Sequence, residues 1–176
     1  MRRLILLYII FFPFLLISQG SKQEKINWIS LEKAEKFAAK YNQDILIFFY
    51  KPNCEYCDKM KKETISDPEV IKLINNNFLP VKLNGYTKDT IVFAGKKYGN
   101  EQPAEKGHFW RHDFYFEYGR YKDGIITPTF VLINSKKEKI TQLTGYQPKI
   151  QFLRGIKRFI KKKKKEWKNQ SLFLWV

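Results

Sequence analysis

The strongest constraint in this sequence is a continuous apolar run that leads within a few residues to two cysteines. Residues 45–50 read Ile-Leu-Ile-Phe-Phe-Tyr, and Pro52 breaks the run shortly before Cys54 and Cys57. An uninterrupted apolar segment of this length is typical of a strand that is covered on both faces of a sheet. The sequence therefore predicts a layered α/β protein that carries a cysteine pair just beyond the end of a buried strand.

The spacing of the two cysteines indicates redox chemistry. At the start of a helix, a spacing of two residues lets both sulfurs meet while only the first faces solvent. Free N–H groups and the partial positive charge of the helix N-terminus stabilise a thiolate at Cys54, which is the nucleophile, and Cys57 resolves the mixed disulfide. The alternative is an inert structural disulfide, although so small a loop gains little stability from chain entropy. Haem attachment would need a histidine where Asp58 stands.

The N-terminal segment has the layout of a targeting signal. Two arginines precede an apolar run at residues 4–17, and Ser-Gln-Gly follows at residues 18–20. This pattern predicts a secretory signal peptide over residues 1–20, cleaved before Ser21, and therefore a periplasmic or secreted protein in a compartment where disulfides persist. The alternative is an uncleaved membrane anchor, for which the run is shorter than the roughly 20 apolar residues of a span.

Helical and strand patterns alternate along the mature chain, in a length that suits one domain. We expect helices over residues 31–41, 54–63 and 87–98, another starting at Asp67-Pro68, and a last one starting at Pro148. We expect strands over residues 45–50, 78–83, 130–133 and 139–144. This order predicts one α/β domain over residues 21–160, built around a mixed sheet.

Residues 100–124 form an insertion rich in aromatic side chains. Its aromatic residues are Phe109, Trp110, Phe114, Tyr115, Phe116, Tyr118 and Tyr121. Two interpretations stand side by side: a substrate-docking lobe, or a lid that covers its own extra core. His108 and His112 are spaced like metal ligands, but a packed or solvated pair is the stronger interpretation, so we expect no metal and no cofactor.

The formal charge of +16 comes from 33 Lys and Arg against 17 Asp and Glu. Five of the lysines are consecutive, at residues 161–165, and an apolar stretch follows at residues 172–176. In an exported protein this excess does not indicate nucleic acid. Residues 161–176 are expected to form a basic and apolar tail, either a solvated helix end or a weak contact with anionic lipid.

Two segments carry a resemblance to a known family. Residues 50–57 (YKPNCEYC) after the apolar strand, and residues 127–130 (TPTF) before the predicted hairpin, resemble thioredoxin-fold proteins. More narrowly, residues 57–70, with Ser-Asp-Pro inside them, are similar to the C-terminal domain of the disulfide interchange protein DsbD and its stand-alone relatives. The resemblance covers most of residues 28–160. It implies a thioredoxin fold, with helices flanking a central mixed sheet and the insertion placed before the strand that follows a cis-proline.

The resemblance also implies roles for individual residues. Pro128 should be the cis-proline beside the sulfurs, and Thr127 should offer backbone groups to an extended substrate segment. Tyr56, between the cysteines, is also expected to contact substrate. The implied protein is an exported thiol–disulfide oxidoreductase of the reductase or isomerase type. It would act on protein thiols and disulfides through Cys54 and Cys57 and be kept reduced by a membrane electron donor.

Two positions depart from the family pattern. Phe48 stands where the family has a buried acid that assists deprotonation of the second cysteine, and Asn53 stands where tryptophan is common. The route of the proton is therefore open. Two other functions are considered: a thioredoxin-fold binding module that docks a partner through its aromatic insertion, and a copper chaperone that uses Cys54, Cys57 and a histidine.

Overall fold

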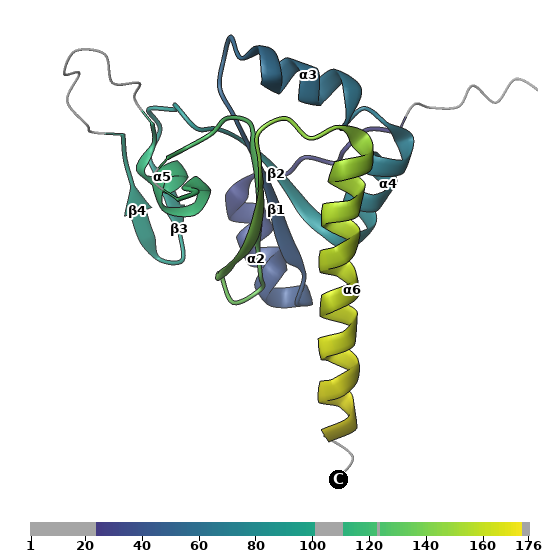
Figure 1. The fold of residues 1–176 in the computed structure, drawn as a ribbon. Coiled ribbons are helices and arrows are strands. Elements are labelled where there is room, and N and C mark those ends of the chain that lie inside the picture. The colour runs from purple at the N-terminus through teal and green to yellow at the C-terminus, as the bar shows by residue number, and fades with distance from the viewer. Residues whose placement is uncertain (1–23, 101–110, 123, 174–176) are drawn as a thin grey trace, which may run out of the picture.

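A mixed sheet forms the centre of the molecule. The computed structural model describes residues 24–100, 111–122 and 124–173, with the side chains of the last helix as far as residue 165. The sheet has the strand order β2 (Phe78–Asn84), β1 (Asp44–Tyr50), β5 (Thr129–Ile133) and β6 (Lys139–Thr144) (Figure 1). β1 runs parallel to β2 and antiparallel to β5, and β5 runs antiparallel to β6. The predicted α/β architecture around a mixed sheet is confirmed.

Side chains of the central strand β1 alternate between two apolar layers. Ile45, Ile47 and Phe49 point into a cluster with α2 (Leu31–Tyr41), α5 (Asp113–Gly119) and the strands β3 (Ile91–Phe93) and β4 (Lys96–Tyr98). Leu46 and Phe48 point into a second cluster with α3 (Glu55–Glu63), α4 (Pro68–Asn77) and α6 (Lys149–Phe173). All these side chains of β1 are buried. The continuous apolar run is thus explained by a strand that is covered on both faces.

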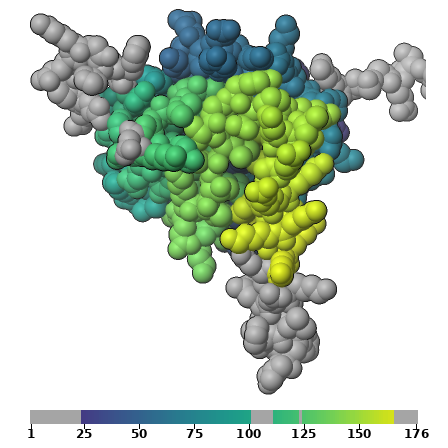
Figure 2. All heavy atoms as spheres, viewed as in Figure 1, coloured from purple at the N-terminus to yellow at the C-terminus, as the bar shows by residue number. Residues whose placement is uncertain are grey.

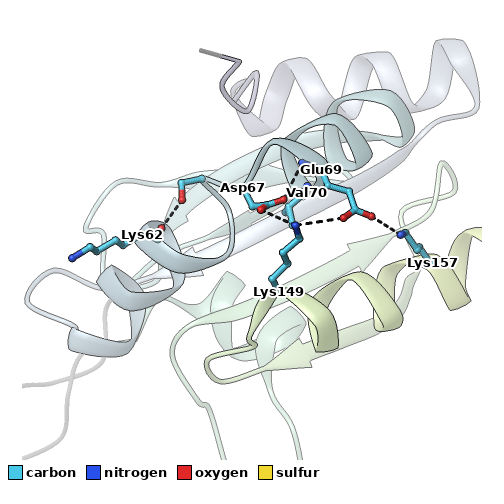
Figure 3. A network of polar contacts seen from close by, with 7 residues as sticks. Lys62, Asp67, Glu69, Val70, Lys149 and Lys157 are labelled. Atoms are coloured by element: carbon cyan, nitrogen blue, oxygen red, sulfur yellow. Dashed lines mark hydrogen bonds and ion pairs between the residues drawn. The ribbon is translucent and has the colours of Figure 1, made fainter.

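Short polar contacts fix the start of α4 and join it to α6. Asp67 caps α4, because its Oδ1 accepts hydrogen bonds from the backbone N–H of Glu69 at 2.9 Å and of Val70 at 3.4 Å. Lys149 of α6 lies 2.8 Å from Asp67 Oδ2, and Lys157 lies 2.7 Å from Glu69 Oε1 (Figure 3). These ammonium groups lower the pKa of both carboxyls. The Asp-Pro signal in the sequence correctly predicts this helix start.

The helix expected over residues 87–98 is wrong. The chain instead forms a hairpin of β3 (Ile91–Phe93) and β4 (Lys96–Tyr98), paired antiparallel. Ala94 and Gly95 connect the two strands with φ values of 54° and 77°, which is the left-handed geometry of a tight two-residue hairpin turn. Phe93 and Tyr98 are buried against α5. Contacts with the insertion therefore override the helical spacing of the apolar residues.

The last helix is longer than expected. α6 continues through the lysine run as far as Phe173, across the boundary that the sequence places after residue 160. Lys163 pairs with Asp44 Oδ1 at 2.7 Å, so one lysine of the run is anchored at the first residue of β1. No helix among the described residues is long and apolar enough to cross a membrane. The predicted signal peptide, residues 1–20, lies outside the described residues.

Candidate active site

The cysteine pair sits at the N-terminus of α3. Cys54 is the N-cap residue, and its Sγ accepts a hydrogen bond from the backbone N–H of Cys57 at 3.2 Å. The two sulfurs form a disulfide. Cys57 is fully buried, whereas Cys54 keeps 5% of its surface exposed. Because a helix N-terminus stabilises negative charge, this geometry favours Cys54 as the thiolate that meets a partner.

A sharp turn carries the chain from β1 into the pair. Tyr50, the last residue of β1, accepts a hydrogen bond at its carbonyl oxygen from the backbone N–H of Gly85 at 2.8 Å. Asn53 then adopts φ of 50°, a left-handed conformation that asparagine tolerates better than most residues. The turn aims Cys54 at the start of α3, just beyond the end of β1.

The loop before β5 lies at the same end of the sheet. The Thr127–Pro128 peptide is cis, as the resemblance predicts. Phe49 pairs with Thr129 in the antiparallel ladder, so Pro128 comes level with the last residue of β1, from which the cysteine loop departs. The carbonyl oxygen of Pro128 accepts a hydrogen bond from Gly145 N–H at 2.8 Å, which ties the loop to the end of β6. The register thus brings the two predicted parts of the site together at one sheet edge.

Phe48 occupies the position of the expected acid and is fully buried. Its ring stacks on Phe130 with centroids 4.7 Å apart and also lies near Trp28 and Tyr50. Among the described residues the only buried carboxylate is Asp44, at the opposite end of β1, which is roughly 20 Å away for a strand of this length. Phe48 therefore contributes packing and offers no proton acceptor to Cys57.

Cationic side chains border the strand that leads to the pair. The Nζ atoms of Lys61 and Lys82 lie 5.3 Å and 4.9 Å from the centre of the Tyr50 ring. Tyr56, between the two cysteines, is 59% exposed. An exposed aromatic ring next to Cys54 is available to an incoming polypeptide, which agrees with its predicted role but does not test it.

His112 has a structural role. It is 1% exposed and caps α5: its Nδ1 accepts a hydrogen bond from Phe114 N–H at 3.1 Å. Its Nε2 therefore carries the hydrogen and donates a hydrogen bond to the carbonyl oxygen of Asp89 at 3.0 Å. Both ring nitrogens are occupied, and His108 lies outside the described residues. In the described part of the chain, no group of three or more His, Cys, Asp or Glu could hold a metal.

Most described aromatic residues of the insertion are buried, and they extend the apolar layer on one face of the central sheet. Phe114, Tyr115 and Tyr118 pack with Phe93 and Tyr98 in the cluster that includes Phe49. Phe116 and Tyr121 are exposed, and Phe109 and Trp110 lie outside the described residues. Because these rings are buried, the interpretation of the insertion as a lid that covers additional core is favoured, and the interpretation as a docking lobe is not.

Sequence reasoning misses one residue next to the site. The hydroxyl of Tyr115 donates to the carbonyl oxygen of Ile126 at 2.8 Å and lies 3.1 Å from Thr127 Oγ1. Tyr115 thereby contacts the loop that contains Pro128. No local pattern reveals this contact, because its partners lie more than ten residues along an irregular segment.

Comparison with known proteins agrees with the fold described above. A family model described as a thioredoxin-like domain matches residues 31–160. A thioredoxin from Thermus thermophilus is similar in structure, with 20% identity and a TM-score of 0.54, over 77% of this chain and 88% of that one. The oxidoreductase DsbH has 18% identity and a TM-score of 0.54, over 78% of this chain and 85% of that one.

The C-terminal domain of DsbD from Neisseria meningitidis, in its oxidised form, is also among the similar structures. It has 19% identity and a TM-score of 0.47, over 73% of this chain and 91% of that one. No curated protein matches the chain by sequence. The family model and the two structures with a TM-score of 0.54 confirm the thioredoxin fold that the sequence predicts.

Proposed function

Because the chain belongs to the thioredoxin-like family, we propose that it is a thiol–disulfide oxidoreductase that exchanges its Cys54–Cys57 disulfide with thiols and disulfides of other proteins. One observation carries the proposal: the pair lies at the N-terminus of α3, and the capping cysteine, Cys54, is the less deeply buried of the two. This placement lowers the cost of a Cys54 thiolate and protects Cys57 until it is needed.

In the reducing direction, the Cys54 thiolate attacks one sulfur of a substrate disulfide and forms a mixed disulfide. The other substrate sulfur leaves as a thiolate and takes up a proton. Cys57 then loses its proton and attacks Cys54 Sγ, which releases the second substrate thiol and forms the Cys54–Cys57 disulfide. Two electrons have passed to the substrate, so a donor dithiol must reduce the pair again. We propose that the protein works in this reducing direction and that the donor dithiol belongs to a membrane protein. The same steps in reverse would oxidise a substrate.

The substrate-side groups of the proposal are Tyr56, Thr127 and Pro128. Tyr56 is exposed beside Cys54, and the cis-proline loop shares the sheet edge from which the cysteine loop departs. An extended substrate segment that lies along this edge would bring its disulfide to Cys54 while it pairs with backbone groups of the loop.

Export and a weak membrane contact complete the proposal. The signal-like residues 1–20 support a periplasmic or secreted location, with membrane anchoring as the alternative. α6 forms part of the molecular surface in Figure 2, and Lys161, Lys164 and Lys165 on it are exposed. Such lysines are attracted to anionic lipid at about 1 kcal/mol each near the surface.

The test is to trap the mixed disulfide. The Cys57→Ser variant cannot complete the second attack, so after incubation with a disulfide-containing protein such as insulin it should accumulate a covalent complex, visible on a non-reducing gel and dissolved by dithiothreitol. The Cys54→Ser variant is the matched control and should form far less complex, because its remaining thiol, Cys57, is completely buried and is not the N-cap residue of α3. Equal trapping by both variants, or by neither, would contradict the proposal.

A further inference from the structure

The buried side chain of Tyr115 places its hydroxyl at the centre of a partly buried group of hydrogen bonds. Its single proton goes to the carbonyl oxygen of Ile126, so the hydroxyl of Thr127 is the donor in the contact with Tyr115. The hydroxyl of Thr129 donates to the same carbonyl oxygen. The hydroxyls of Tyr115 and Thr129 thus share the carbonyl oxygen of Ile126 as acceptor, and the hydroxyl of Thr127 donates to Tyr115. Burial raises the pKa of Tyr115, so the donor stays protonated.

The ring that carries this hydroxyl is held in place from both sides. It stacks on Phe49 with centroids 4.4 Å apart and planes 18° apart. Gly85 and Gly119 lie so close to its edges that a Cβ on either would collide with the ring. Tyr115 itself is fully buried. The hydroxyl therefore has one available position, the one that meets the loop before β5.

Gly85 connects the same ring to the cysteine loop. Its N–H donates to the carbonyl oxygen of Tyr50, at the end of β1, and its carbonyl oxygen accepts from His112 N–H, each at 2.8 Å. His112 is the N-cap of α5, the helix that carries Tyr115. A continuous path of contacts thus runs from Tyr50, before the cysteines, through Gly85 and α5 to the loop around Pro128.

We propose that the insertion is a positioning device for substrate, in which Tyr115 holds the loop at Ile126 and Thr127 in register with the cysteine loop. This inference rests on the proposed function and deepens it. Tyr115 touches neither sulfur, so it acts through the loop that receives the substrate backbone. Its loss should weaken the binding of protein substrates while the chemistry of the pair itself stays intact.

The test is the Tyr115→Phe variant, which keeps the ring and removes only the hydroxyl. With a protein disulfide as substrate, we expect KM to rise roughly three- to tenfold, the scale of one lost hydrogen bond, and kcat to change less than twofold. The reduction potential of the Cys54–Cys57 pair and its rate of reduction by dithiothreitol should match the wild type. The Tyr118→Phe variant is the matched control, since Tyr118 is buried on the same helix but has no hydrogen bond to the loop at residues 126–127. It should leave KM unchanged.

A second variant guards against an unstable Tyr115→Phe protein. Thr127→Val removes the hydroxyl that donates to Tyr115 and should also raise KM. In the double variant the increase should be smaller than the product of the two single effects, because both act through one network. An unchanged KM in Tyr115→Phe, an equal loss of reactivity toward dithiothreitol, or strictly multiplicative effects would each overturn the inference while the proposed function stands. A wild-type protein that reduces no protein disulfide would overturn both.

Discussion

Each face of the central sheet is covered by a buried apolar layer, but the two faces contribute different groups to the active site. The face under α3, α4 and α6 carries the cysteines, and its inner layer contains Phe48, Phe130 and Phe152. The polar contacts between α4 and α6 are ion pairs on partly exposed side chains. The face under α2, the β3–β4 hairpin and α5 carries no cysteine, yet its buried hydroxyl of Tyr115 contacts the loop around Pro128.

We infer from this difference that one face carries the redox chemistry and the other positions the substrate. The redox pair depends on the helix start at α3, which the thioredoxin fold supplies. Because Phe48 is apolar, it provides no buried acid beside the pair. In our proposal, the approach of substrate depends on the insertion, whose Tyr115 packs in the opposite layer and contacts the loop before β5. A change to either face should therefore alter one property and spare the other.

The largest expected effect is on stability, from Phe114→Ala in α5. Phe114 is fully buried among Phe49, Phe93 and Tyr98, so its truncation should lower the free energy of unfolding by about 3–5 kcal/mol, as Phe48→Ala should on the opposite face. Phe116→Ala, on the exposed side of the same helix, is the control and should cost less than about 1 kcal/mol. Denaturant unfolding measures all three. A cost for Phe114→Ala no larger than that of the control would show that the insertion is not part of the core.

A smaller effect is expected from adding one methyl group on each face. Gly119→Ala drives a Cβ into the ring of Tyr115, which Phe49 and two hydrogen bonds hold in place, so it should lower stability by about 1–3 kcal/mol and raise KM for protein substrates. Gly155→Ala in α6 meets only the end of the Leu143 side chain, at 2.9 Å, which can move aside. It should cost less and leave KM alone. Equal effects on KM would contradict the division between the faces.

The smallest effect concerns the ion pairs between α4 and α6. The pKa of Asp67 is lowered mainly by its hydrogen bond from Lys149, so the folded state gains stability above the ordinary carboxyl pKa near 4 and loses it as the pH falls through the lowered value. Asp67→Asn keeps a capping side chain and removes the charge. It should reduce stability by less than about 1 kcal/mol at pH 7, because the pair is partly exposed.

Thermal unfolding of Asp67→Asn and wild type across pH 2–7 checks the sign of this effect. The difference in Tm should shrink toward zero as the pH falls through the lowered pKa of Asp67, because the wild-type carboxyl is then protonated too. A difference that is the same at every pH would assign the effect to the cap and not to Lys149.

Local signals predict the redox face well. The apolar run predicts β1, Asp67-Pro68 predicts the start of α4, and the spacing of Cys54 and Cys57 after a strand predicts their place at the start of α3. The cis peptide at Thr127–Pro128 follows from the family resemblance. Each of these features depends on residues that are close together in the sequence, so a pattern can report it.

The insertion face is predicted less well, because its structure depends on distant contacts. Residues 91–98 have helical spacing but become a hairpin, since Ala94 and Gly95 make a tight turn and Phe93 packs against α5. The contact of Tyr115 with Thr127 likewise depends on Gly85 and Gly119, which leave room for the Tyr115 ring, and no single window of sequence contains all four residues. For the same reason, the lysine run at residues 161–165 predicts a solvated helix end but not the ion pair that joins Lys163 to Asp44.

The reduction potential of the Cys54–Cys57 pair tests the central claim most directly. The protein is equilibrated in buffers of reduced and oxidised dithiothreitol or glutathione, and the fraction of dithiol is measured by thiol alkylation. A working exchange pair should give a single two-electron transition between about −270 and −180 mV, within the range of catalytic thioredoxin-fold proteins. A potential below about −300 mV, typical of structural disulfides, would contradict the account, because the pair would then be inert.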